Sequence, residues 1–120
     1  MHVNHIEWRI HPFRADRWLE AWRPAIERAA AFGARACYLT RNIDDPLHFR
    51  QVSLWADRED FDRYWASDEI SALRQEAMNY YNKPVLWVWH SLVEEAGGGA
   101  PPEEAGTAEA EAGTAAEVSD

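Results

Sequence analysis

The order of strand and helix patterns in this chain of 120 residues predicts an α+β fold. Residues 3–10 alternate between apolar and polar side chains, as a half-buried strand does. A helical apolar stripe follows over 16–32, then two strand patterns over 34–41 and 47–55, helical patterns over 58–81, and a last strand over 85–93. This βαββαβ order predicts a ferredoxin-like unit, in which a four-stranded antiparallel sheet carries its helices on one face.

The first strand has one apolar and one polar face. Its apolar side chains are Ile6, Trp8 and Ile10, and its polar side chains are His5, Glu7 and Arg9. The helical pattern that follows, over 16–32, spaces its apolar residues three and four apart. Pro24 lacks an amide donor, so we expect a kink or a break between Trp22 and Pro24. Gly33 suits the left-handed position that ends many helices.

A hairpin is expected to join the second strand to the third. The strand over 34–41 is followed by Asn42 to Pro46, a run of turn-forming residues. The third strand, over 47–55, is expected to lie beside the first and parallel to it. Its apolar residues occupy both faces, with Leu47, Phe49 and Trp55 on one side and Val52, Leu54 and Ala56 on the other.

An aromatic helix follows the third strand directly. Asp57, Glu59 and Asp60 crowd its first turn, where carboxylates favour a helix N-terminus. Its apolar face carries Phe61, Tyr64 and Trp65. Asp68 is expected to cap a further helical run that ends before Pro84. The last strand, over 85–93, is nearly apolar on both faces, which is typical of a strand covered on both sides.

The open side of the predicted sheet needs a cover. Both crossover helices lie on one face, so the apolar residues of the third and fourth strands on the other face would form a patch larger than soluble monomers usually expose. We therefore predict a homodimer in which two copies pack their open sheet faces together.

Charge divides the chain into a domain over 1–95 and a tail over 96–120. The domain holds all twelve basic and fifteen of the acidic residues, whereas the tail holds six acidic residues and no basic one. The tail has almost no large apolar side chains, so we expect it to be disordered, either as a solubilising segment or as a tether for a partner. A nearly balanced domain also lacks the clustered cations that nucleic-acid binding requires.

Cellular context follows from what the sequence lacks. Cys37 is the single cysteine, so an intrachain disulfide is impossible and a reducing compartment is expected. No apolar run reaches the length of a signal peptide or a membrane span. We therefore expect a cytoplasmic protein without a membrane partner.

One segment resembles a known family. The residues from Phe49 to Trp55, the acidic turn after them, and the aromatic residues of the next helix look like those of the antibiotic-biosynthesis-monooxygenase family. The resemblance extends over residues 3–94. It implies a dimeric α/β barrel with a pocket in each copy. The family includes cofactor-independent oxygenases of aromatic polyketides, haem-degrading enzymes and many small proteins without an assigned reaction.

The sequence departs from the active members in the helical run after the aromatic helix, where the oxygenase relatives usually carry one or more histidines and the haem-degrading relatives carry a histidine ligand. No histidine lies between Trp65 and Tyr81, and Arg74 falls about where those relatives carry their haem ligand. A guanidinium stays protonated and does not ligate iron, which argues against haem degradation by that scheme. Asn4 lies close to where these relatives carry an asparagine.

Polar residues on the first and third strands are the candidate catalytic groups. His5 or His48 is a candidate base for a phenolic or enolic substrate, because histidine titrates near neutral pH. Arg9 or Arg50 would hold the resulting anion, and Glu7 completes the set. The candidate substrate-binding residues are Asn4, Tyr38, Trp55, Trp65 and Trp87. The alternative is that the charged residues form structural cross-strand ion pairs.

The leading prediction is a dimer that binds a small apolar or aromatic molecule and oxygenates it without a cofactor. The alternatives are a non-catalytic binding or assembly module with a tethering tail, and a haem-binding relative. The five histidines show no HxH or HxxxH spacing on one element, so no metal site is expected.

Overall fold

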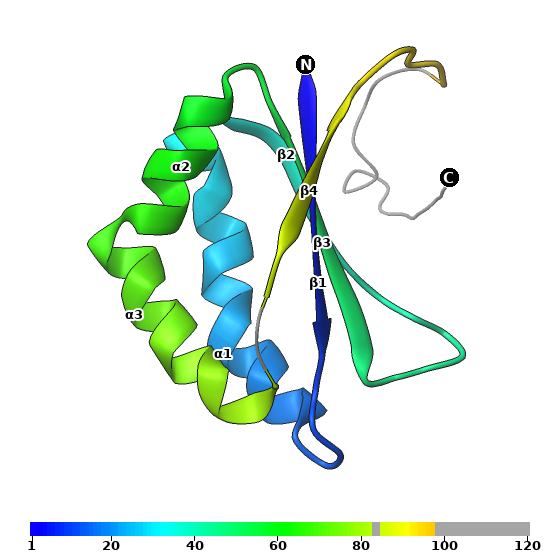
Figure 1. The fold of residues 1–120 in the computed structure, drawn as a ribbon, viewed down its shortest axis with the longest axis vertical. Helices are drawn as coiled ribbons and strands as arrows, with labels where there is room; N and C mark the ends of the chain where they lie inside the picture. Colours follow the sequence, from blue (N-terminus) through cyan, green and yellow to red (C-terminus); the bar gives the residue numbers. More distant parts are fainter. Residues whose placement is uncertain (83–84, 98–120) are drawn as a thin grey trace.

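The structure is a computed structural model that describes residues 1–82 and 85–97. Within them, a four-stranded sheet of order β2-β3-β1-β4 carries all three α-helices on one face, which confirms the ferredoxin-like fold (Figure 1). The strands are β1 (His2–Arg9), β2 (Ala34–Arg41), β3 (His48–Trp55) and β4 (Trp87–Ser91). The helices are α1 (Ala15–Arg28), α2 (Arg58–Ala66) and α3 (Asp68–Ala77), and short 3₁₀ turns follow α1 (Ala29–Phe32) and α3 (Met78–Tyr80).

Every pair of neighbouring strands is antiparallel, so the prediction that the first and third strands run parallel is wrong. The crossover through α1 makes β2 run in the same direction as β1. The hairpin at Asn42–Pro46 then reverses the chain, so β3 runs opposite to β1. Asn42 closes this hairpin, because its side-chain oxygen accepts hydrogen bonds from the amides of Asp44 and Asp45.

The helices cover the face of the sheet that the sequence marks as apolar. Ile6, Trp8 and Ile10 are at most 3% exposed, which confirms the predicted inward face of the first strand. The largest fully buried side chains are Trp18, Trp22, Phe49, Trp55, Phe61 and Tyr64. The core is therefore a layer of aromatic rings between sheet and helices.

Of the kink or break expected between Trp22 and Pro24, the break is wrong, because α1 runs unbroken from Ala15 to Arg28. At its C-terminal end the helix tightens, where the amide of Ala29 bonds to Ile26 in a 3₁₀ pattern. The nearby carbonyl of Ala25 accepts a hydrogen bond of 2.7 Å from the buried Tyr64 hydroxyl. This bond ties α1 to α2.

The residues that end and cap the helices agree in part with those predicted from the sequence. Gly33 adopts a φ of 113° at the end of the 3₁₀ turn, as predicted. Asp57 caps α2 by accepting a hydrogen bond from Glu59. The cap of α3 is Ser67 rather than Asp68, because the Ser67 hydroxyl accepts from the amide of Ile70 at 3.2 Å. Capping needs an extended residue just before the helix, and Asp68 is already helical.

The last strand is shorter and more exposed than predicted. β4 spans Trp87–Ser91 at the edge of the sheet, and Val88 on its open side is 55% exposed. In the single chain it is therefore not covered on both sides. Residues after β4 pass to the side of the sheet away from the helices, where Glu95 pairs with Arg35 at 2.7 Å (Figure 1).

Two predictions concern regions beyond this core. Most of the predicted disordered tail, from residue 98 on, lies outside the described residues. Among the described helices, none combines the length and the apolar character that crossing a membrane requires.

Candidate functional site

The sheet separates the predicted site residues into two groups. Side chains of directly paired residues share a face, so the register places His5, Glu7, Arg9, Tyr38, His48 and Arg50 on the open face. Asn4, Trp55 and Trp87 lie on the covered face, and Trp65 on α2 packs against it. The structure therefore does not bring the predicted catalytic residues and most of the predicted binding residues together.

The charged residues of the open face pair with one another. The Glu7 carboxylate accepts bonds from Arg50 at 3.0 and 3.2 Å and lies 3.1 Å from Nε2 of His48. The hydrogen bond with His48, together with the charge of Arg50, lowers the pKa of Glu7. Arg9 pairs with Asp45 at 2.6 Å. This geometry fits the structural ion pairs that the sequence left open as the alternative.

His5 lies in a different setting on the same face. Its ring meets that of His90 edge to face, with ring centroids 4.9 Å apart. Burial lowers the pKa of His5, and the neighbouring His90 and Arg50 lower it further. The neutral imidazole is therefore favoured near pH 7.

Asn4 is the exceptional residue of the covered face. It is fully buried, and neither its side-chain oxygen nor its nitrogen has a hydrogen-bond partner among the described residues. In the register it stands between Trp89 of β4 and Ser53 of β3. The Ser53 hydroxyl accepts a bond of 2.8 Å from Nε1 of Trp55. The Asn4 amide is thus a buried donor and acceptor without a protein partner in this part of the chain.

Aromatic rings surround this half of the covered face. Phe61 of α2 lies at their centre. Its ring is stacked on that of Trp65, with centroids 5.6 Å apart, and stands edge-on to Trp87 and Trp89, each with a centroid distance of 5.4 Å. Trp55 lies 5.7 Å away on β3. The acidic turn after β3 sends α2 directly back over the strand it follows, which is why this helix covers that half of the sheet.

Arg74 of α3 brings a positive charge to the same aromatic group. Its guanidinium carbon lies 4.8 Å from the centre of the Trp65 ring, and its Nε is buried without a partner in the described residues. The candidate site residues from the sequence did not include Arg74. A signal was present, because Arg74 lies between Ile70 and Ala77 on the buried side of α3.

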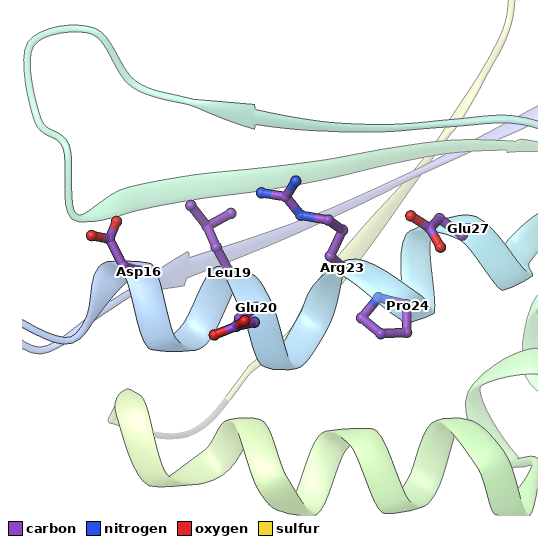
Figure 2. Close-up of a pocket in the computed structure, with 6 residues that line it drawn as sticks. All are labelled: Asp16, Leu19, Glu20, Arg23, Pro24 and Glu27. Atoms are coloured by element: carbon purple, nitrogen blue, oxygen red, sulfur yellow. The ribbon is translucent and has the colours of Figure 1, made fainter.

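Two grooves lie along the outer surface of α1, away from these residues. The first, of about 510 Å³, is lined by Asp16, Leu19, Glu20, Arg23, Pro24 and Glu27. In Figure 2, Leu19 and Arg23 extend toward the β2–β3 hairpin, whereas Glu20 and Pro24 turn away from it. The second, of about 380 Å³, lies between α1 and the edge strand β2. Neither groove contains a predicted site residue.

Metal ligands do not gather anywhere in residues 1–82 and 85–97. No group of three or more His, Cys, Asp or Glu side chains there is placed to hold a metal ion.

A sequence model of one protein family matches more than half of this chain. The model of antibiotic biosynthesis monooxygenases matches residues 1–76, which extend from β1 through most of α3. The chain belongs to the antibiotic biosynthesis monooxygenase family. The matched segment includes Asn4, Trp65 and Arg74, whereas β4 lies beyond it.

Solved structures agree with the family's fold. A crystal structure of an antibiotic biosynthesis monooxygenase is 22% identical, covers 78% of this chain and 100% of its own, and has a TM-score of 0.71. A proposed family member from Nitrosomonas europaea is 17% identical, with the same coverages and a TM-score of 0.73. Rv0793 from Mycobacterium tuberculosis is 17% identical over 81% of this chain and 100% of its own, with a TM-score of 0.69. No curated protein matches the chain.

Proposed function

We propose that this family member binds a small aromatic molecule with an ionisable oxygen between the sheet and helices α2 and α3, and oxygenates it without a cofactor. The observation that carries the proposal is the buried Asn4 amide with no partner among the described residues. Buried polar groups almost always have a partner, and leaving one unpaired costs about 1–3 kcal/mol. A ligand oxygen at this position would supply the partner.

The surroundings of Asn4 suit such a ligand. Phe61, Trp65, Trp87 and Trp89 offer ring faces and edges for aromatic packing. An amide both donates and accepts, so Asn4 can hold a carbonyl or a hydroxyl group. Arg74 places a fixed positive charge next to Trp65, and a nearby cation lowers the pKa of a phenol or an enol. The site therefore favours the anionic form of the substrate.

An anionic substrate of this kind supplies all the electrons that the reaction needs. The CH₂ group beside the aromatic ring loses a proton to solvent, and the resulting carbanion transfers electrons to O₂, forms a C–O bond and takes a proton from solvent to become a hydroperoxide. Loss of water then converts the original CH₂ group to a carbonyl, so one oxygen atom stays in the product and the other leaves as water. In this scheme Asn4 orients the substrate oxygen, and Arg74 stabilises its negative charge.

We further propose that two copies pair through their open sheet faces, which is the assembly that the family resemblance implies. Four strands of up to eight residues form a face of about 19 by 26 Å, or ~500 Å² on each copy. Two such faces reach the ~1,000 Å² at which specific interfaces begin. The exposed Val88 would be covered in such a dimer.

Oxygen uptake with dithranol, an anthrone that bears two phenolic hydroxyls, tests the proposed reaction. We expect Asn4→Leu and Arg74→Met to reduce the rate above the protein-free blank by about tenfold or more, the loss expected for a charged or buried hydrogen bond. Arg63→Met is the matched control for charge, because Arg63 is an exposed residue of α2 whose partner is Asp60.

A second comparison separates the two faces of the sheet. The double variant His5→Gln, His48→Gln removes both histidines that the sequence suggested as bases. If it loses activity while Asn4→Leu and Arg74→Met keep the wild-type rate, the reaction belongs to the open face and the proposal is wrong.

A binding module without turnover is the second candidate function. It is favoured by the close packing around Phe61, whose ring centroid lies 5.4–5.7 Å from those of four tryptophans. This candidate predicts saturable quenching of tryptophan fluorescence by a hydroxyanthraquinone, with no oxygen uptake from dithranol. Haem binding in place of an aromatic ligand would produce a Soret band when haemin is added.

A further inference from the structure

The open face of the sheet has an apolar half and a charged half. Two rows of paired residues cross the apolar half. The first contains Ala36, Leu54, Val3 and His90, and the second contains Tyr38, Val52, His5 and Val88. The charged half begins with a row of Thr40, Arg50 and Glu7, and the row after it contains His48 and Arg9. Among the residues of the first two rows, His5 and His90 are therefore the ones whose positive charge would oppose close packing, and the Arg35–Glu95 ion pair lies on the same side of the sheet.

His5 lies within this apolar half and close to groups that disfavour its charge. Its direct neighbours across the sheet are Val52 and Val88. The charged and titratable groups around it are Glu7 on its own strand, Arg50 on β3 and His90 on β4, and Tyr38 lies in the same row on β2. Only Glu7 favours a proton on His5, and Glu7 is already bonded to Arg50 and His48.

We propose that two copies of this chain pair through their open faces only while His5 is uncharged, so that mild acid separates them. This inference rests on the dimer proposed above. Two copies would bring four imidazoles into a surface otherwise lined by valine, leucine, alanine and the tyrosine of each copy. A charge moved into such a surface loses hydration, and a second like charge nearby adds repulsion.

The direction of the pH effect follows from the state of His5. Burial and the neighbours of His5 lower its pKa below the usual value of about 6.5 already in the single chain. Pairing buries the ring further and lowers the pKa again, so separated copies bind more protons than the dimer does. Association is then unaffected well above pH 6.5 and weakens as the pH falls below it. If each copy takes up one proton on separation, the dimer takes up two, and its association constant falls by up to ~100-fold per pH unit.

The carboxylate at the centre of the charged half does not produce the same effect in this range. The hydrogen bond with His48 and the charge of Arg50 lower the pKa of Glu7, which keeps its carboxylate ionised at pH 5.5. The ion pairs of Glu7 with Arg50 and of Arg9 with Asp45 are formed within each copy and persist when the copies separate.

Sedimentation equilibrium of the full chain at pH 7.5 and 5.5 tests the inference, with circular dichroism to follow folding. We expect the wild-type dimer to dissociate about tenfold more readily, or more, at pH 5.5, with the fold unchanged. His5→Gln should remove most of this difference, and His90→Gln should reduce it. His11→Gln is the control away from the face, because His11 bonds to Asn82.

Each result decides a different point. A dimer whose dissociation constant is the same at both pH values, or whose pH dependence survives in His5→Gln, overturns the inference and leaves the proposed dimer standing. A chain that is monomeric at both pH values overturns the dimer as well. Neither result bears on oxygen uptake, because the proposed reaction site lies on the other face of the sheet.

Discussion

Replacing Asn4 by leucine should make the protein more stable. Leucine has the same branching as asparagine, and the change removes a buried amide that has no partner among the described residues. The expected gain is about 1–3 kcal/mol in the free energy of unfolding. For a domain of this size, that corresponds to a rise of roughly 5–15 °C in the melting temperature. Urea unfolding followed by tryptophan fluorescence measures the gain.

Gln51 provides the matched control on the same covered face. It is also fully buried, but its side-chain oxygen accepts a hydrogen bond of 2.8 Å from Nε1 of Trp22. Its nitrogen lies 3.5 Å from the Tyr64 hydroxyl. Gln51→Met keeps the length of the side chain but leaves the indole unpaired, so it should destabilise the protein by about 1–3 kcal/mol. The two substitutions therefore have opposite expected signs.

A loss of more than about 1 kcal/mol in Asn4→Leu would refute this reasoning, because it would show that the Asn4 amide has a partner in the folded protein. A gain in stability together with a loss of ligand binding is the result expected of a residue kept for function at the expense of stability.

Three further predictions test other parts of the structure. Tyr64→Phe removes the hydrogen bond to the Ala25 carbonyl and should lower the free energy of unfolding by about 1–3 kcal/mol, whereas an unchanged urea midpoint would show that this bond adds nothing. Gly33→Ala places a Cβ atom 2.9 Å from the Asp60 carboxylate at a φ of 113°, so it should cost about 1 kcal/mol or more in the same assay. Burial raises the pKa of Cys37 to about 12, so Ellman's reagent at pH 8 should label the folded protein much more slowly than the unfolded protein, and equal labelling rates would contradict the raised pKa.

The sequence predicted the fold well because each element carries a local pattern. Alternation along the first strand identified its buried face, and Ile6, Trp8 and Ile10 are buried as expected. The turn residues from Asn42 to Pro46 predicted the hairpin, and Gly33 marked the end of the first helical segment. In contrast, the effect of Pro24 was overestimated. A proline on the exposed side of a helix loses one hydrogen bond, and packing of the buried stripe holds the helix together.

The site was harder to predict because it depends on which face of the sheet each residue occupies. His5 and Asn4 are adjacent in the sequence but lie on opposite faces, so the sequence-based set joined residues that the sheet separates. The position of Arg74 on the buried side of α3 was visible in the sequence, but its contact with Trp65 depends on how the chain turns at Ser67 between α2 and α3. The missing partner of Asn4 is likewise a property of the packed structure.

The measurement that tests the proposed site most directly is an NMR titration of the side-chain amide of Asn4 with a hydroxyanthraquinone. We expect saturable shifts of the Asn4 side-chain resonances and of the Trp65 indole, with both lost in Arg74→Met. Shifts confined to histidines of the open face or to residues along α1, with Asn4 unchanged at saturation, would contradict a ligand site between the sheet and helices α2 and α3.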